Sequence, residues 1–276
     1  GLAAQLRRGA AAGGQRAAQL HLLRVASGLQ LQPHGLAADA GRPPVDRWLA
    51  AIDGTAAVTL DKTLLAGVPM TGQLQLATHG QRLSLRGQLQ SGANTVSIDG
   101  QRGPSASADA LDLQVKAEAL DAWAPLAPLA DALLPGVVKV WPTAGQLESQ
   151  WRVEGRWPEL RSSGRLQVRA LQSPTLRIAS ATAQWQLAQD PGAALALSLE
   201  LSGLEQRGQR IDQLELQVNG SLAEHRMRLR LDSPLRPPAW TENLLGPAGS
   251  GTRLDAEGRG QWRPSAQGGG QWSLQG

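Results

Sequence analysis

The 276-residue sequence contains no cysteine, no phenylalanine and no tyrosine. Without cysteine the chain can form no disulfide, no thiolate nucleophile and no zinc–thiolate site, and the redox compartment is left open. Leucine, valine, alanine and nine tryptophans must therefore form any hydrophobic interior.

Long hydrophobic runs are also missing. No run approaches the roughly 18 to 20 apolar residues that a membrane-spanning helix needs, and the N-terminus lacks the charged-then-apolar pattern of a signal peptide. The sequence begins at Gly1 without methionine and ends at Gly276 directly after a strand-like run. We therefore expect an internal fragment of a longer protein.

Signatures of catalysis and metal binding are sparse. The four histidines are isolated, and none has a second histidine or a carboxylate at ligand spacing. The chain has no Gly-x-Ser-x-Gly elbow, and the glycine-rich segment 246–252 ends on Thr252 where a phosphate-binding loop requires lysine. The sequence predicts no enzyme, no catalytic residue, no metal and no cofactor.

The charge balance is modestly basic, with 27 basic and 23 acidic residues and a net charge of +4. The arginines alternate with Gln, Glu, Asp and Ser, which is typical of a solvated strand face. An RNA-binding sheet would expose aromatic side chains among basic ones, whereas Trp151 and Trp185 share strand parity with leucine and valine. No nucleic-acid partner is expected.

What the sequence does contain is alternation. Leu147, Trp151 and Val153 occupy one parity while Gln146 and Glu148 occupy the other, which predicts strands with one apolar and one polar face. The same pattern recurs along most of the chain, and in the strand around Leu166 it also assigns Ala170 to the apolar face. The residues predicted to line this face are Leu74, Leu76, Leu83, Leu85, Leu111, Leu113, Val115, Leu147, Trp151, Val153, Leu166, Val168, Trp185, Leu187, Leu195, Leu197, Leu199, Leu214, Leu216, Val218, Leu229 and Leu231.

Two segments interrupt the alternation. Apolar spacing over 45–52 predicts a short helix that ends at Asp53-Gly54, and the leucines between Pro125 and Gly136 predict a second one lying over the open end of the apolar face. The rest predicts about 13 to 15 antiparallel strands. Because open sheets rarely exceed about ten strands without curling or splitting, the sheet must close, fold over or wrap. We expect an irregular, short-strand segment over 1–44, a first β repeat over 45–136 and a second over 137–276.

The residues alone leave three interpretations of the apolar face. It could be the closed core of a β-sandwich that acts as a binding or adhesive domain. It could belong to a scaffold whose strand edges pair with a client chain. It could instead remain accessible as a lining.

Several segments resemble repeats of the TamB family. They are Val45-Asp-Arg-Trp-Leu-Ala-Ala-Ile-Asp-Gly54, Leu65-Ala-Gly-Val-Pro-Met-Thr-Gly-Gln-Leu74, the Leu/Pro segment 125–136 leading to Gly145-Gln-Leu and Val153-Glu-Gly-Arg-Trp-Pro-Glu-Leu160, Val218-Asn-Gly-Ser-Leu-Ala-Glu-His-Arg-Met227, and the Trp-bearing strands at 261–274. The resemblance extends over most of residues 45–276.

The resemblance implies a fold and a role. The family is related to AsmA-like and VPS13-type bridge proteins, and its fold is an all-β, elongated antiparallel sheet curled into an open hydrophobic trough (β-taco-like), here with one or two short helices. The implied location is the Gram-negative periplasm, with an inner-membrane anchor and an Omp85-type outer-membrane barrel partner outside this sequence. The implied activity is conduction of phospholipids, whose acyl chains contact the lining. The alternative is a non-enzymatic scaffold or chaperone for autotransporter or barrel assembly.

Overall fold

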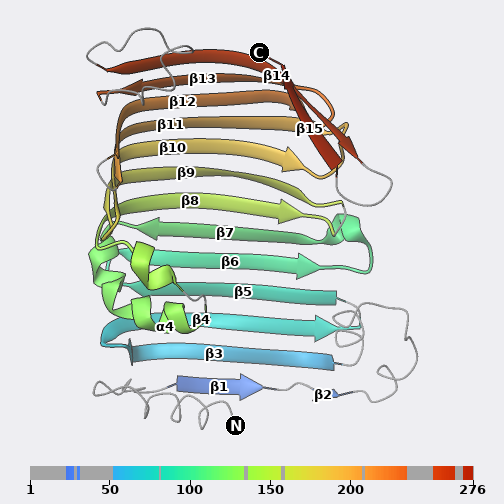
Figure 1. The fold of residues 1–276 in the computed structure, drawn as a ribbon. Helices are drawn as coiled ribbons and strands as arrows, with labels where there is room; N and C mark the ends of the chain where they lie inside the picture. The colour runs from blue at the N-terminus through green and yellow to red at the C-terminus, as the bar shows by residue number, and fades with distance from the viewer. Residues whose placement is uncertain are drawn as a thin grey trace.

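The computed structural model describes residues 23–27, 30–31, 52–80, 82–133, 136–156, 159–206, 209–234, 251–264 and 270–275. These residues form one open antiparallel sheet (Figure 1). Its strands are β1 (Leu23–Ser27), β2 (Gln30–Leu31), β3 (Ile52–Leu65), β4 (Val68–His79), β5 (Arg82–Ser91), β6 (Asn94–Arg102), β7 (Ala110–Ala117), β8 (Ala144–Glu154), β9 (Arg161–Gln172), β10 (Leu176–Ala188), β11 (Ala194–Gln206), β12 (Gln209–Ser221), β13 (His225–Ser233), β14 (Thr252–Pro264) and β15 (Gly270–Gln275).

The sheet is a meander. From β3 to β15 each strand pairs with its neighbours in sequence, while β1 and β2 both lie against β3. Most connections are short, so consecutive strands run antiparallel. Period-two patterning fixes their register because a one-residue slip would turn every apolar side chain to the other face. The predicted all-β, open and curled fold is confirmed.

No second sheet packs against this one within the described strands. A closed β-sandwich is therefore not the fold of this part of the chain, and that interpretation of the apolar face is wrong. Strands before and after residue 136 belong to the same sheet. The division into segments 1–44, 45–136 and 137–276 stays a prediction.

The expected helix end at Asp53-Gly54 is wrong. Asp53 pairs with Gln30 of β2, and Gly54 pairs with Thr78 of β4. Pairing with strands on both sides outweighs a short stretch of helical apolar spacing. Residues 45–51, the remainder of that predicted helix, lie outside the described residues.

The helix expected before Gly136 is confirmed, as part of a longer helical connector between β7 and β8. We call residues 120–140 the connector. It comprises the 3-10 helix η2 (Leu120–Leu126), the α-helix α4 (Ala127–Leu133) and the 3-10 helix η3 (Val137–Val140). A further short 3-10 helix, η1 (Ala106–Ala108), joins β6 to β7. Figure 1 shows the connector gathered at one end of β3 to β8, and η2 contacts both β4 and β8.

Strands β8 to β12 carry irregularities near the end of the sheet where they bend (Figure 1). Ala170 and Gly203 have φ angles of 48° and 61°. Ser180 pairs with Ser202 and Ile178 with Leu204, so Ala179 and Gly203 fall outside the regular pairing. Bulges of this kind bend a strand and increase its twist, which is how a long sheet acquires curvature.

One consequence corrects the sequence prediction for Ala170. This residue is exposed and sits in the left-handed region instead of pointing to the apolar face. The parity of β9 changes there, so Leu171 takes the place that simple alternation would give to Ala170.

Candidate functional site

The candidate site is the apolar face of the sheet, which we call the inner face. Directly paired residues on neighbouring strands share a face, so the register defines rows of side chains across the sheet. One row runs without a break from β3 to β14 and consists of Leu60, Gly72, Leu89, Val96, Val115, Ser149, Leu166, Ala183, Leu199, Leu216, Leu229 and Ala256.

Parallel rows lie on either side of it. The next row is Val58, Leu74, Gly87, Ile98, Leu113, Trp151, Gly164, Trp185, Leu197, Val218, Met227 and Gly258. On the connector side the row is Ala117, Leu147, Val168, Ala181, Leu201, Leu214, Leu231 and Leu254. On the side away from the connector, which we call the far side, a further row begins with Ala56, Leu76, Leu85, Gly100, Leu111, Val153, Ser162 and Leu187.

Register and strand parity place every residue predicted to line the apolar face on the inner face. Leu83 and Leu195 lie toward its far edge. Leu83 pairs with Thr78 and Arg102, and Leu195 pairs with Gly220. Whether these residues line a path for lipid remains a proposal.

Part of the inner face is open to solvent. The relative exposure is 40% for Leu74, 39% for Leu111, 46% for Trp151 and 38% for Leu187. Leucines in a closed core are almost fully buried. Contiguous apolar surface of this kind marks a place where another molecule binds.

A tryptophan pair interrupts the aliphatic rows at the middle of the sheet. Trp151 and Trp185 flank Gly164, and both indole N–H groups donate to Ser162 Oγ, at 2.8 and 3.1 Å. A Cβ on Gly164 would lie 2.4 Å from a ring carbon of Trp185. Glycine is therefore required for the Trp185 ring to lie over β9, and Ser162 satisfies two donors that an apolar surface would leave unpaired.

Sequence reasoning missed several members of the inner face. Ser162 and Gly164 escaped it because neither is apolar. Leu171, Ile178, Leu204 and Ile211 pair with one another across β9 to β12. Each of these residues lies next to a bulge. The sequence signal that could have identified them is an apolar spacing of three residues within a strand, such as Leu201 to Leu204.

One end of the inner face is covered by the connector. Val68 and Met70 on β4, which η2 contacts, are 3% and 9% exposed, and Leu120 of η2 is 4% exposed. Asn94 is fully buried. Its amide donates to the carbonyl of Ala119 at 2.7 Å, and its Oδ1 accepts from the Ala119 N–H at 3.0 Å. This pair of hydrogen bonds fixes the start of the connector to β6.

A polar cluster lies at the opposite ends of the strands. Asp109 pairs with Arg156 and accepts the Gly103 N–H at 2.8 Å, while Arg102 lies 4.0 Å away. Burial alone would raise the pKa of Asp109, but the hydrogen bonds from Arg156 and Gly103, together with the charges of Arg156 and Arg102, hold that pKa below its ordinary value. The cluster joins the η1 loop to the end of β8.

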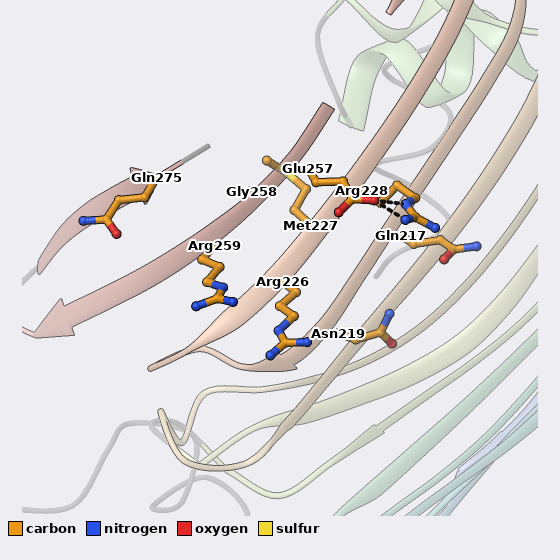
Figure 2. A pocket seen from close by; sticks show the side chains of 9 residues that line it. All are labelled: Gln217, Asn219, Arg226, Met227, Arg228, Glu257, Gly258, Arg259 and Gln275. Atoms are coloured by element: carbon orange, nitrogen blue, oxygen red, sulfur yellow. Dashed lines mark hydrogen bonds and ion pairs between the residues drawn. The ribbon is translucent and has the colours of Figure 1, made fainter. Parts of the chain in front are cut away.

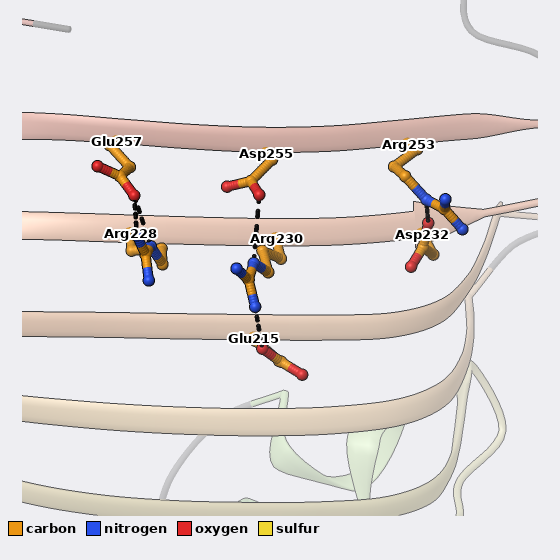
Figure 3. Close-up of polar contacts among 7 residues, drawn as sticks. All are labelled: Glu215, Arg228, Arg230, Asp232, Arg253, Asp255 and Glu257. Atoms are coloured by element: carbon orange, nitrogen blue, oxygen red, sulfur yellow. Dashed lines mark hydrogen bonds and ion pairs between the residues drawn. The ribbon is translucent and has the colours of Figure 1, made fainter.

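The opposite face of the sheet, which we call the outer face, carries ion pairs between strands. Figure 3 shows those of β12 to β14: Arg228 with Glu257, Arg230 with Asp255 and Glu215, and Arg253 with Asp232. These side chains are at least two fifths exposed, so each pair contributes little stability but keeps the face hydrated.

Among the described residues there is no group of three His, Asp or Glu side chains placed to hold a metal ion. Within the same residues, every helix is too short or too polar to cross a lipid bilayer.

Comparison with known proteins places the chain in a family. No curated protein and no solved structure matches it significantly. A family model described as "TamB, N-terminal domain" matches residues 65–237, which extend from the end of β3 to just beyond β13. The match covers more than half of the chain and most of the sheet. The protein therefore belongs to the TamB family of periplasmic, bridge-like proteins.

Proposed function

We propose that the inner face is a non-enzymatic conduit along which phospholipids move between the inner and outer membranes. In this role the chain is a periplasmic segment of a longer, inner-membrane-anchored protein, with an Omp85-type outer-membrane barrel as its partner. Family membership supports the periplasmic, bridge-like setting. The path of the lipid along the inner face is proposed from the family resemblance together with the arrangement of the lining.

The observation that carries the proposal is the row from Leu60 to Ala256, which crosses the sheet from β3 to β14 without a charged residue. An acyl chain gains about 0.8 kcal/mol for each methylene group that leaves water. A charged side chain in its path would oppose this gain, because burying an unpaired charge is costly. The rows of leucine and valine avoid that cost across the sheet.

Movement also requires that no position bind a lipid too strongly. The residues of the row are aliphatic or small and offer similar contacts from strand to strand, so the free energy of an acyl chain changes little as it advances. The polar members of the lining do not add a strong site. Ser162, for example, already accepts two indole N–H groups.

The test is site-specific photo-crosslinking in cells with probes at adjacent residues of opposite faces. Trp185 and Gln184 form one matched pair on β10, and Leu216 and Gln217 form another on β12. We expect phospholipid attached to probes at Trp185, Leu216 and Leu197, and none at Gln184 or Gln217.

Two results would contradict the proposal. One is the absence of lipid at every inner-face probe while those side chains are protected from solvent. The other is equal labelling of the two faces. Cross-links from the edge strand β15 to polypeptide, without lipid on the inner face, would favour the scaffold for autotransporter or barrel assembly, since an edge strand offers unpaired backbone groups to a client.

A further inference from the structure

On the outer face, one pair of arginines departs from the pairing of its neighbours. Arg226 and Arg259 lie directly opposite each other on β13 and β14. Within the part of the chain that the structure describes, neither makes an ion pair or a side-chain hydrogen bond, whereas Arg228, Arg230 and Arg253 on the same two strands are all paired with carboxylates. This is the one arginine–arginine pair in the register of the described strands.

Acidic residues that face each other elsewhere on the sheet are compensated. Asp99 and Asp112 are directly opposite, but Arg86 binds the first and Arg152 binds the second, at 3.1 and 2.8 Å. Glu200 faces Glu215, which has Arg230 on its other side at 3.8 Å.

The row through Arg226 and Arg259 has no such compensation. It is flanked by Asn219 and Gln275, both neutral. The carboxylate of Glu257, two residues from Arg259, is already bound by two nitrogens of Arg228. Like charges directly opposite each other destabilise a sheet. An anion bound between them would reverse that effect.

The surroundings of the two arginines form a hollow. Its volume is about 490 Å³, and its lining includes Arg226, Arg259, Asn219, Gln275 and Arg228. Figure 2 shows Arg226 and Arg259 projecting the same way from adjacent strands, with Asn219 beside Arg226. Side chains directly opposite in an antiparallel pair have Cβ atoms about 4.5 to 5.5 Å apart. Two guanidinium groups can therefore reach one small anion.

The donors define the chemistry of that anion. A guanidinium group is a planar fork that binds phosphate through two parallel N–H···O hydrogen bonds. The side-chain amides of Asn219 and Gln275 supply neutral N–H donors on the same row. We propose that Arg226 and Arg259 form a binding site for a phosphate group, carried by a lipid headgroup or free in solution. The site lies on the face opposite the proposed conduit and does not depend on it.

The first experiment titrates inorganic phosphate into the protein by calorimetry at low ionic strength. We expect saturable binding that weakens as salt is added, because the site is exposed and charge-based. Arg226→Gln and Arg259→Gln should each weaken binding at least tenfold, and the double variant should show none. The matched control is Arg169→Gln, which removes an exposed outer-face arginine between the neutral Gln146 and Ser180 and should change affinity less than twofold.

A second experiment identifies the source of the phosphate by sedimenting the protein with vesicles of phosphatidylcholine, with and without phosphatidylglycerol. If the protein binds inorganic phosphate but does not bind vesicles, the ligand is a soluble phosphate. Binding to the anionic vesicles that is lost in the double variant but kept in Arg169→Gln supports a lipid headgroup.

Thermal unfolding is the control that shows whether the variants fold. Removing one or both like charges should leave the midpoint unchanged or higher, and phosphate should raise the midpoint of the wild type but not that of the double variant. The proposal is overturned if the wild type binds neither probe, if the double variant binds like the wild type, or if Arg169→Gln loses as much binding as the double variant.

Discussion

The connector end of the inner face and the remainder of that face are built from the same strands but differ in how far their side chains are buried. At the connector end, Val68, Met70 and Leu120 are almost fully buried. Farther along the rows, Leu74, Leu111 and Trp151 keep about two fifths of their surface in water. The sequence patterning of the two regions is alike, so patterning alone does not decide whether an apolar strand face is covered.

The connector covers one end of the face. This helical segment supplies Leu120 to the covered end and is fastened there by Asn94. The covered end therefore behaves as a small hydrophobic core, and the open region depends on its backbone ladder and on whatever occupies the face. Substitutions should separate the two regions.

The largest effect is expected where the connector is fastened. Asn94→Ala removes the partners of both the N–H and the carbonyl of Ala119. Leaving these groups unsatisfied in a partly buried position should lower the free energy of unfolding by about 2 to 3 kcal/mol, measured by urea denaturation. Asn219→Ala, on the exposed outer face, is the control and should change it little. Equal losses in the two variants would show that the connector is not held through Asn94.

Truncating one buried and one open residue compares the two regions directly. Met70→Ala should cost about 2 to 3 kcal/mol, because it leaves a cavity under the connector. Leu216→Ala should cost about 1 kcal/mol in denaturation without lipid, because Leu216 is only partly removed from water. A loss at Leu216 as large as that at Met70 would mean that the open region is covered as well.

A methyl group at Gly164 tests the tryptophan pair. The added Cβ would meet the Trp185 ring at 2.4 Å and the Gln150 carbonyl at 2.5 Å, so Gly164→Ala should displace the ring and cost about 1 to 2 kcal/mol. Near-ultraviolet circular dichroism should change along with stability. Gly192→Ala, whose Cβ would meet only ordinary contacts, should alter neither. An unchanged spectrum for Gly164→Ala would argue against the ring lying over β9.

The smallest effect belongs to the polar cluster far from the connector. Because the pKa of Asp109 is lowered in the folded state, its ionised form stabilises the protein above the unfolded-state pKa near 3.8, and this stability is lost as the pH falls. Asp109→Asn should therefore cost about 1 kcal/mol at neutral pH, with the difference from wild type shrinking below about pH 5. The exposed Asp99→Asn, which removes a surface ion pair with Arg86, is the comparison and should cost less stability at neutral pH. A difference that does not shrink with acid would rule out this role for the charge.

Simple alternation predicted the strands, the meander and the membership of the inner face. It worked because the side-chain period of a strand is two and most strands here are regular over several residues, as in Leu195 to Leu201. Alternation failed at Ala170, where a bulge shifts the parity. The helical spacing that predicted a helix end at Asp53-Gly54 also failed, because these residues pair with β2 and β4.

The details of the candidate site depend on contacts between strands, which no local pattern carries. Gly164 accommodates a ring from β10, and Ser162 accepts hydrogen bonds from β8 and β10. Arg226 faces Arg259 only because of the register between β13 and β14, two strands that residues 234–251 separate in the sequence. The family resemblance supplied the open trough, which strand patterning alone could not distinguish from a closed sandwich.

The consecutive pairing of the strands also means that the length of the inner face increases by a fixed amount with each strand. Neighbouring strands lie about 4.8 Å apart, so each added hairpin extends the inner face by about 10 Å, and the unbroken row from β3 to β14 spans roughly 50 Å. Since each strand from β4 to β15 pairs only with its neighbours in sequence, a hairpin could be gained or lost without disturbing the register of the others. The length of the inner face is therefore set by the number of hairpins and changes in steps of two strands.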